Sequence, residues 1–414
     1  MKLATLVLGM RLLCSAKIAV ASDLAQLMVK ATDHAPQVQQ SRRLVTAAAA
    51  ATAGYGRYLP TITAVGESYH RAQDGSFGRS ALVRVEQPVI APFEWAQRRV
   101  DAAAATLAEQ DLNVAINDAL YATISAYLHL QAVLWKEELT ELFIVEQRAQ
   151  MENIEVLVRN SHKTLLDLAE TKSLLLELEE SKALYRLDEN RLKGELLYLT
   201  GDAAINLKPV DMRKMLKLIP VTITDQVATA SLGHSRALAQ ENLDQMQWHQ
   251  EVSRLLPTFS LFVEKDLQAS AQARQAEQSS ARVGLSVQWT IFQGGSTSPR
   301  TGLYHDLLRF DRREAELEAS RFTAKYQKFV IEAGLLDQDL IQLEKITSFD
   351  KESIALASEA MTSGYYSLAE LANRKRRYHE MQLRYCDKTV DRLMASLGTH
   401  YIAGKLATLP VGEL

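Results

Sequence analysis

The sequence is short of cysteine, of net charge and of long apolar runs. It contains only Cys14 and Cys386, and the first lies in a segment that we expect to be removed, so no intramolecular disulfide is expected. Its formal net charge of −3 argues against a nucleic-acid partner, because binding to phosphates needs a concentrated face of lysine and arginine. The one dense basic run, at residues 374–377, is better interpreted as a solvated helix face than as a polyanion site. After residue 21, no segment approaches the ~20 uncharged apolar residues of a membrane-spanning helix.

Signatures of enzymes and of cofactor sites are also missing. The sequence has no HExxH, no P-loop, no GxGxxG and no CxxC. Its histidines, His305 and His379 among them, lack the spacing of metal ligands. We therefore expect no enzymatic activity, no cofactor and no metal.

Glycine and proline are absent from residue 93 to residue 193, and apolar residues recur there every seven positions. A seven-residue period keeps one stripe of a helix facing its partner in a coiled coil, so it predicts one helix of on the order of 100 Å. The positions in this stripe are Phe93, Val100, Leu107, Val114, Tyr121, Leu128, Trp135, Leu142, Ala149 and Val156. A second copy follows at Leu303, Phe310, Leu317, Ala324 and Ile331, joined by Phe322, Phe329, Leu336 and Leu343 as the stripe moves round the helix.

Each long helix is predicted to end at a turn and to return. The turns are expected at residues 159–162 and 362–365, where Asn160 and Gly364 tolerate the left-handed conformation that ends a helix. The returning helices are expected to end near Gly201 and Gly404.

Four segments alternate apolar and polar residues, which predicts strands at 61–69, 80–90, 258–267 and 281–292. Their lengths are near the ~9 to 11 residues of a tilted strand that crosses a bilayer. In the last segment, Val287 shares an apolar side with Leu285 and Trp289, and we expect that side to meet lipid. Two hairpins of a soluble sandwich are the alternative.

The sequence consists of two similar halves. Arg-Tyr-Leu-Pro at 57–60 and Arg-Leu-Leu-Pro at 254–257 both close a helix and open a strand, about 200 residues apart. Solenoid repeats are much shorter, at about 20 to 50 residues, so this is a duplicated half-protein. The predicted organisation is a signal peptide at 1–21, a first repeat at 22–208, a linker at 209–224, a second repeat at 225–406 and a tail at 407–414.

The first 21 residues have the three parts of a secretory signal. Met1 and Lys2 precede an apolar stretch, and Ala19-Val20-Ala21 has the form of a cleavage site. A shorter signal that starts at Met10 is an alternative. Lipidation of Cys14 is disfavoured because no small residue precedes it.

Several motifs resemble the TolC family of outer-membrane channel proteins. The segment 285–295 ends in Phe-x-Gly-Gly, with Gly294 and Gly295 at the strand-to-helix turn, and His34-Ala35-Pro36 is similar to the start of the family's first helix. The duplicated order of helix, strand hairpin and helical hairpin covers residues 23–406. The resemblance implies a mainly α fold with a membrane β-barrel contribution. Long α-helical hairpins then form a trimeric periplasmic tunnel, and four strands per chain complete a twelve-stranded barrel.

The same resemblance implies a channel in the cell outer membrane with a long periplasmic extension. Such a homotrimer receives substrates from an inner-membrane transporter and a periplasmic adaptor protein, for efflux or for type I protein secretion. A periplasmic coiled-coil scaffold without channel activity is the alternative, although it leaves the four alternating strands without a role.

The resemblance also implies site residues beyond the two turns. The expected channel aperture consists of Asp167, Glu170, Glu370 and Asn373. The sequence departs from the family where Ser161 replaces a glycine, Asn373 an acid and Tyr366 a basic residue, and the alternative is that these acids are ordinary solvated helix surface. The expected adaptor-docking tips are Asn160, Ser161, His162, Ser363, Gly364, Tyr365 and Tyr366.

Overall fold

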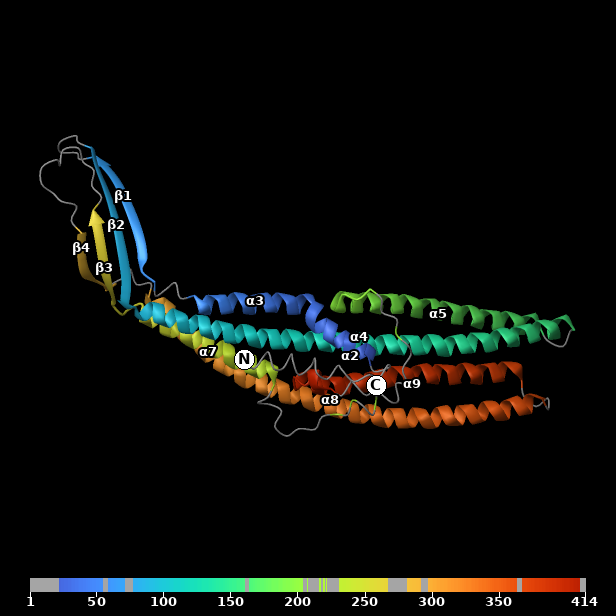
Figure 1. Cartoon of the computed structure of the whole chain (residues 1–414). Helices are drawn as coiled ribbons and strands as arrows, with labels where there is room; N and C mark the ends of the chain where they lie inside the picture. The colour runs from blue at the N-terminus through green and yellow to red at the C-terminus, as the bar shows by residue number, and fades with distance from the viewer. Residues whose placement is uncertain are drawn as a thin grey trace, which may run out of the picture. The chain divides into compact units, whose positions relative to one another are not determined.

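The computed structural model describes residues 22–54, 59–70, 77–160, 164–203, 207, 216, 219, 221, 231–266, 281–291, 297–362 and 367–409. Its first half contains α2 (Ser22–His34), α3 (Pro36–Ala53), β1 (Thr61–His70), β2 (Phe77–Ile90), α4 (Pro92–Arg159) and α5 (Leu165–Thr200). Its second half contains α7 (Leu232–Ser253), β3 (Thr258–Asp266), β4 (Ala281–Gln288), α8 (Thr297–Thr362), α9 (Leu368–Ile402) and the short 3-10 helix η3 (Leu406–Thr408). The order of helix, strand pair and two long helices therefore occurs twice, as the duplicated sequence predicted (Figure 1).

The predicted helix ends are confirmed. Helix α4 ends at Arg159 and α8 at Thr362, where the turns were expected. Gly201 follows α5 with a φ of 69°, and its N–H donates to the Leu197 carbonyl at 2.8 Å. Gly404 follows α9 with a φ of 64°. Glycine tolerates this left-handed conformation, which explains why both returning helices end there.

The four predicted strands are confirmed, with two corrected ends. Strand β2 begins at Phe77, earlier than expected, and β4 ends at Gln288, so Trp289 and Ile291 lie beyond it. The last ladder pair joins Thr258 of β3 to Gln288. Pro257, directly before β3, has no N–H to extend the ladder. Beyond the ladder, the Trp289 indole N–H donates to the Leu255 carbonyl at 3.0 Å.

The chain divides into two compact units. The hairpin unit consists of Met1–Gln40, Asn113–Leu232 and Ser320–Leu414, and the sheet unit consists of Ser41–Leu112 and Gly233–Ala319. The hairpin unit holds α5, α9 and the larger parts of α4 and α8, and the sheet unit holds all four described strands with the first parts of α4 and α8.

The sheet unit contains one antiparallel sheet in the order β1-β2-β3-β4 (Figure 1). Because directly paired residues share a face, its register separates two kinds of side chain. One face carries an apolar row across all four strands, Ile62, Val85, Val263 and Val283. The neighbouring row on the other face carries Arg84, Glu264 and Arg282. Alternating charges thus stabilise the polar face, while β1 and β4 form the edges of this sheet.

Position 284 lies on the polar face, and a glycine fits there because an aromatic ring covers it. A Cβ at this position would lie 2.9 Å from the ring of Phe262, its partner on β3. The guanidinium of Arg84 stacks over the same ring, with its carbon 4.6 Å from the centroid. A side chain at position 284 would displace this stack.

The core of the hairpin unit lies where α2, α4 and α9 meet. It contains Leu24, Leu27, Leu120, Ile124, Leu128, Val390, Leu393, Leu397 and Leu406. These are branched apolar side chains that exclude water from the helix contacts, and the Asn117 amide, which donates to the Tyr401 carbonyl at 2.9 Å, borders them.

The predicted seven-residue stripe on α4 is buried or half-buried from Phe93 to Trp135 and is wrong from Leu142 onward. Val100 and Leu128 are buried as predicted, whereas Leu142 is 63% exposed and Val156 is also exposed. A second line, two residues before the predicted one, is also buried, at Leu112, Ala119, Ala126, Thr140, Gln147 and Ile154. In the last third of the helix only the second of these two lines stays buried, so the apolar pattern of the sequence marked positions beside it.

On α8 the two predicted stripes separate. Phe322, Leu336 and Leu343 are buried within the chain. Leu303, Phe310, Leu317, Ala324 and Ile331, the first predicted stripe, are all exposed. Helix α8 therefore carries one apolar stripe that the chain covers and one that it leaves open.

Candidate functional site

Asp167, one of the four predicted aperture residues, lies in the first turn of α5 and caps it. The carboxylate Oδ2 accepts from the Thr164 N–H at 3.0 Å and from the Thr164 hydroxyl at 2.8 Å. The Asp167 N–H in turn donates to the Thr164 hydroxyl oxygen at 3.2 Å. This reciprocal pair is a capping box, which supplies partners to the free N–H groups at a helix start.

Glu370 has the same role at the start of α9. Its Oε2 accepts from the Ser367 N–H at 3.2 Å and from the Ser367 hydroxyl at 2.9 Å. These two hydrogen bonds lower the pKa of the Glu370 carboxyl, because they favour its charged form. Asp167 and Glu370 thus occupy matching places in the two repeats for a structural reason. The patterns Thr-x-x-Asp and Ser-x-x-Glu could have revealed it from the sequence.

The structure brings three of the four predicted aperture residues together. Asp167, Glu170 and Asn373 line one hollow of ≈ 300 Å³, whereas Glu370 is not among its lining residues. The sequence interpretation missed further polar residues of this hollow. They are Gln147, Gln150, Thr171, Ser173, Glu177 and Arg376. The signal for Glu177 was its position seven residues after Glu170, which places both on one helix face.

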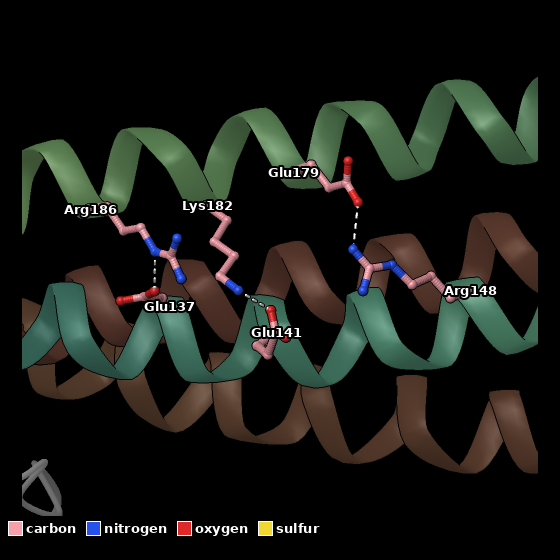
Figure 2. Close-up of polar contacts among 6 residues, drawn as sticks. All are labelled: Glu137, Glu141, Arg148, Glu179, Lys182 and Arg186. Atoms are coloured by element: carbon pink, nitrogen blue, oxygen red, sulfur yellow. Dashed lines mark hydrogen bonds and ion pairs between the residues drawn. The ribbon is translucent and has the colours of Figure 1, made fainter.

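Ion pairs join α5 to α4, in addition to the buried cluster of Phe143, Ile144 and Leu178 (Figure 2). The Arg186 Nε lies 3.0 Å from the Glu137 carboxylate, and the Arg148 Nη2 lies 2.6 Å from that of Glu179. Lys182 pairs with Glu141 between them, and its hydrogen bond lowers the pKa of the Glu141 carboxyl. All three pairs lie near the surface, so salt screens them.

Contacts between α4 and α9 join the two helical hairpins. Lys136 pairs with Asp387, and Lys375 pairs with Glu146. The buried His379 ring stacks on Phe143, with ring centroids 4.7 Å apart, and burial lowers its pKa. A neutral imidazole fits this apolar contact. Across the ranges that the structure describes, no group of three or more His, Cys, Asp or Glu side chains is placed to hold a metal ion.

The predicted docking tips fall mostly outside the described residues. Asn160 directly follows α4, and its N–H donates to the Val156 carbonyl at 3.1 Å. Ser161, His162, Ser363, Gly364, Tyr365 and Tyr366 lie outside the described residues, as do Gly294 and Gly295 at the predicted strand-to-helix turn.

The apolar face of the sheet is open in the single chain. Val283, Leu285 and Val287 on β4 are exposed, and so are Leu261 and Val263 on β3. In contrast, Ser260 on the polar face is buried, and its carbonyl accepts from the Ser286 hydroxyl at 3.4 Å. None of the helices in the described ranges combines the length and the apolar character needed to cross a membrane.

No protein-family model and no curated protein sequence matches the chain, so its likeness to known proteins is one of structure. A membrane protein from Pseudomonas aeruginosa matches with a TM-score of 0.81 at 15% identity, over 92% of this chain and 92% of that one. CusC, described with transmembrane channel formation, matches with a TM-score of 0.81 at 10% identity, over 94% and 95%. The CmeC outer membrane channel from Campylobacter jejuni matches with a TM-score of 0.79 at 12% identity, over 92% and 86%. The chain therefore has the fold of TolC-family outer-membrane channels, as its sequence predicted.

Proposed function

We propose that the chain is the outer-membrane channel subunit of a tripartite export system. In this proposal it spans the outer membrane with its strands, extends its helices into the periplasm and works as a homotrimer. A periplasmic adaptor protein and an inner-membrane transporter supply the substrate, by efflux or by type I protein secretion. The observation that carries the proposal is the fold, which matches solved outer-membrane channels over 92% or more of this chain.

The open apolar surfaces support a trimer. Leu303 is 58% exposed and Phe310 is 64% exposed, in a stripe that continues to Leu317 at seven-residue spacing. Such a stripe costs free energy in water unless another helix covers it. Four strands leave β1 and β4 with unpaired edges, and edges are not tolerated in lipid. A second and a third chain would cover the stripe and pair the edges into a twelve-stranded barrel.

The aperture and the docking tips belong to the same proposal. Asp167, Glu170, Glu370 and Asn373 narrow the periplasmic end of the tunnel, where copies from three chains crowd negative charge around one axis. The residues at the two helix turns, 160–162 and 363–366, meet the adaptor protein.

Assembly is the first test. Native mass spectrometry of the protein extracted from outer membranes should give three chains per particle. Leu303→Glu with Phe310→Glu should reduce the trimer, because a charge in a covered apolar stripe loses its hydration. Glu314→Gln on the same helix is a control for charge change alone. A soluble monomer in the periplasm would favour the scaffold alternative and contradict the channel.

The aperture has its own test in planar bilayers. Asp167→Asn with Glu370→Gln keeps an acceptor oxygen at each cap but removes the charge, so both helices should still form. The reversal potential in a salt gradient should then move away from cation selectivity, because the fixed negative field is lost. An unchanged reversal potential would assign these carboxylates to helix capping alone.

A further inference from the structure

The hollow at the ends of the hairpins has a built polar wall. Helix α4 contributes Gln147 and Gln150, α5 contributes Glu170 and Glu177 among others, and α9 contributes Arg376. All of these residues belong to the hairpin unit, so the hollow forms within one chain.

Gln147 is the unusual member of this wall. Its side chain is 0% exposed, yet neither its amide nitrogen nor its amide oxygen has a hydrogen-bond partner among the described residues. The Gln150 amide oxygen is also buried without a partner there. A buried amide without a partner is destabilising, and an apolar residue of similar size would avoid that penalty. A ligand in the hollow that hydrogen-bonds to the Gln147 amide would therefore stabilise the folded protein.

The charges of the lining residues indicate that such a ligand is positively charged. Asp167, Glu170 and Glu177 outnumber the single cation of the lining, Arg376. Arg376 pairs with Glu380 at 2.9 Å and interacts electrostatically with Glu177 across the hollow, which leaves Glu170 without a cation in the lining. Neither Glu170 nor Glu177 forms a hydrogen bond or an ion pair through its carboxylate with a described residue. The hollow consequently has an excess of acceptors and of negative charge.

We propose that this hollow binds a small organic cation of the polyamine class, with its N–H groups donating to Glu170, Glu177 and the Gln147 amide oxygen. A point ion fits less well, because among the described residues no three acidic, histidine or cysteine side chains converge on one centre. An extended cation reaches carboxylates that are spread along a helix face. Bound there, it contacts α4 and α5 of the first hairpin and α9 of the second.

Calorimetric titration of the purified full-length protein with spermidine tests this site. The expected result is saturable binding at one site per chain. Glu177→Gln should weaken it about tenfold or more, since a charge-assisted hydrogen bond is lost. Gln147→Leu should weaken binding while leaving the protein without spermidine at least as heat-stable, because the unpaired amide is gone. Neither residue belongs to the proposed aperture, so this result is separate from channel activity.

The control is Glu138→Gln, an exposed acid on α4 outside the hollow, which should bind spermidine as the unchanged protein does. Equal weakening by Glu138→Gln and Glu177→Gln would mean general attraction to a negative surface and would overturn the proposal. Absence of saturable binding, or unchanged binding by both Glu177→Gln and Gln147→Leu, would also overturn it.

Discussion

The two helical hairpins of the hairpin unit differ in the polar contacts that supplement their buried clusters. The first, α4 with α5, has a buried cluster of Phe143, Ile144 and Leu178 and a row of ion pairs near the surface. The second, α8 with α9, has a buried cluster of Leu340, Leu343 and Tyr385, beside a two-pronged pair of Arg392 with Asp337 at 2.6 and 2.9 Å. Leu176, Leu184 and Leu187 on α5 remain exposed. The polar contacts of the first hairpin are therefore the more open to screening by salt, and leucines of α5 are available to a neighbour.

The largest expected effect comes from the buried cluster of the second hairpin. Leu343→Ala should destabilise the protein by ~2–5 kcal/mol, because it removes a buried side chain and leaves a cavity. Urea unfolding followed by circular dichroism measures this loss. The matched control is Leu187→Ala on exposed α5, expected to stay within about 0.5 kcal/mol in the monomeric form. Equal losses in the two variants would contradict the open position of the α5 leucines.

A like-charged contact between α7 and α8 in the sheet unit extends the comparison to pH. Asp311 is 7% exposed beside Asp244, and burial followed by Asp244 raises the pKa of the Asp311 carboxyl to about 7. The folded chain therefore favours the protonated form, and this stabilisation is present near pH 4 and is lost as pH rises through about 7.

Asp311→Asn should remove this pH dependence, since an amide keeps the shape and cannot ionise. In thermal melts, the melting temperature of the variant minus that of the unchanged protein should be larger at pH 9 than at pH 5. The nearby acids Glu241 and Glu314 keep their charge in both proteins, so Glu314→Gln serves as the control for reduced repulsion. The same difference between variant and parent at both pH values would contradict the assignment.

The Arg392 pair sharpens the comparison at a smaller scale. Arg392→Lys keeps the charge but loses the planar fork that reaches both Asp337 oxygens, and it should cost about 1 kcal/mol. Arg384→Lys, at an exposed position of the same helix, should have no measurable effect. If the two variants unfold alike, the fork contributes nothing to the second hairpin.

The smallest effect should come from salt. Raising NaCl from 0.05 to 1 M shortens the screening length to about 3 Å and should speed hydrogen exchange around Lys182 and Arg186 of α5 more than around the buried Arg392 of α9. Exchange measured by mass spectrometry at the two salt concentrations separates the helices. Faster exchange confined to α9 would reverse the comparison of the hairpins.

Patterns within one segment predicted the elements of the fold. Alternation at 281–288 marked β4, and the absence of glycine and proline marked α4, because both signals depend only on neighbours in the chain. The buried line of α4 that contains Ala119, Ala126 and Gln147 was missed, since alanine is small and glutamine is polar. Their burial follows from which helix lies opposite, and hydrophobicity does not report that.

The candidate site was predicted only in part, because local sequence patterns do not report which helices pack together. Asp167 and Asn373 were named from their distance to the turns, and both line the hollow. The capping roles of Asp167 and Glu370 were readable from four-residue patterns but were not recognised. Gln147 and Arg376 line one hollow only after α4 and α9 pack together, about 230 residues apart in the chain, so no local pattern indicates that they lie near each other.

Single-channel recording in planar lipid bilayers tests the central claim most directly. The purified protein should insert and give discrete, uniform conductance steps, and Leu303→Glu with Phe310→Glu should reduce them by weakening assembly of the proposed trimer. Membrane-inserted protein that gives no conductance steps at any applied voltage or salt concentration would contradict the channel.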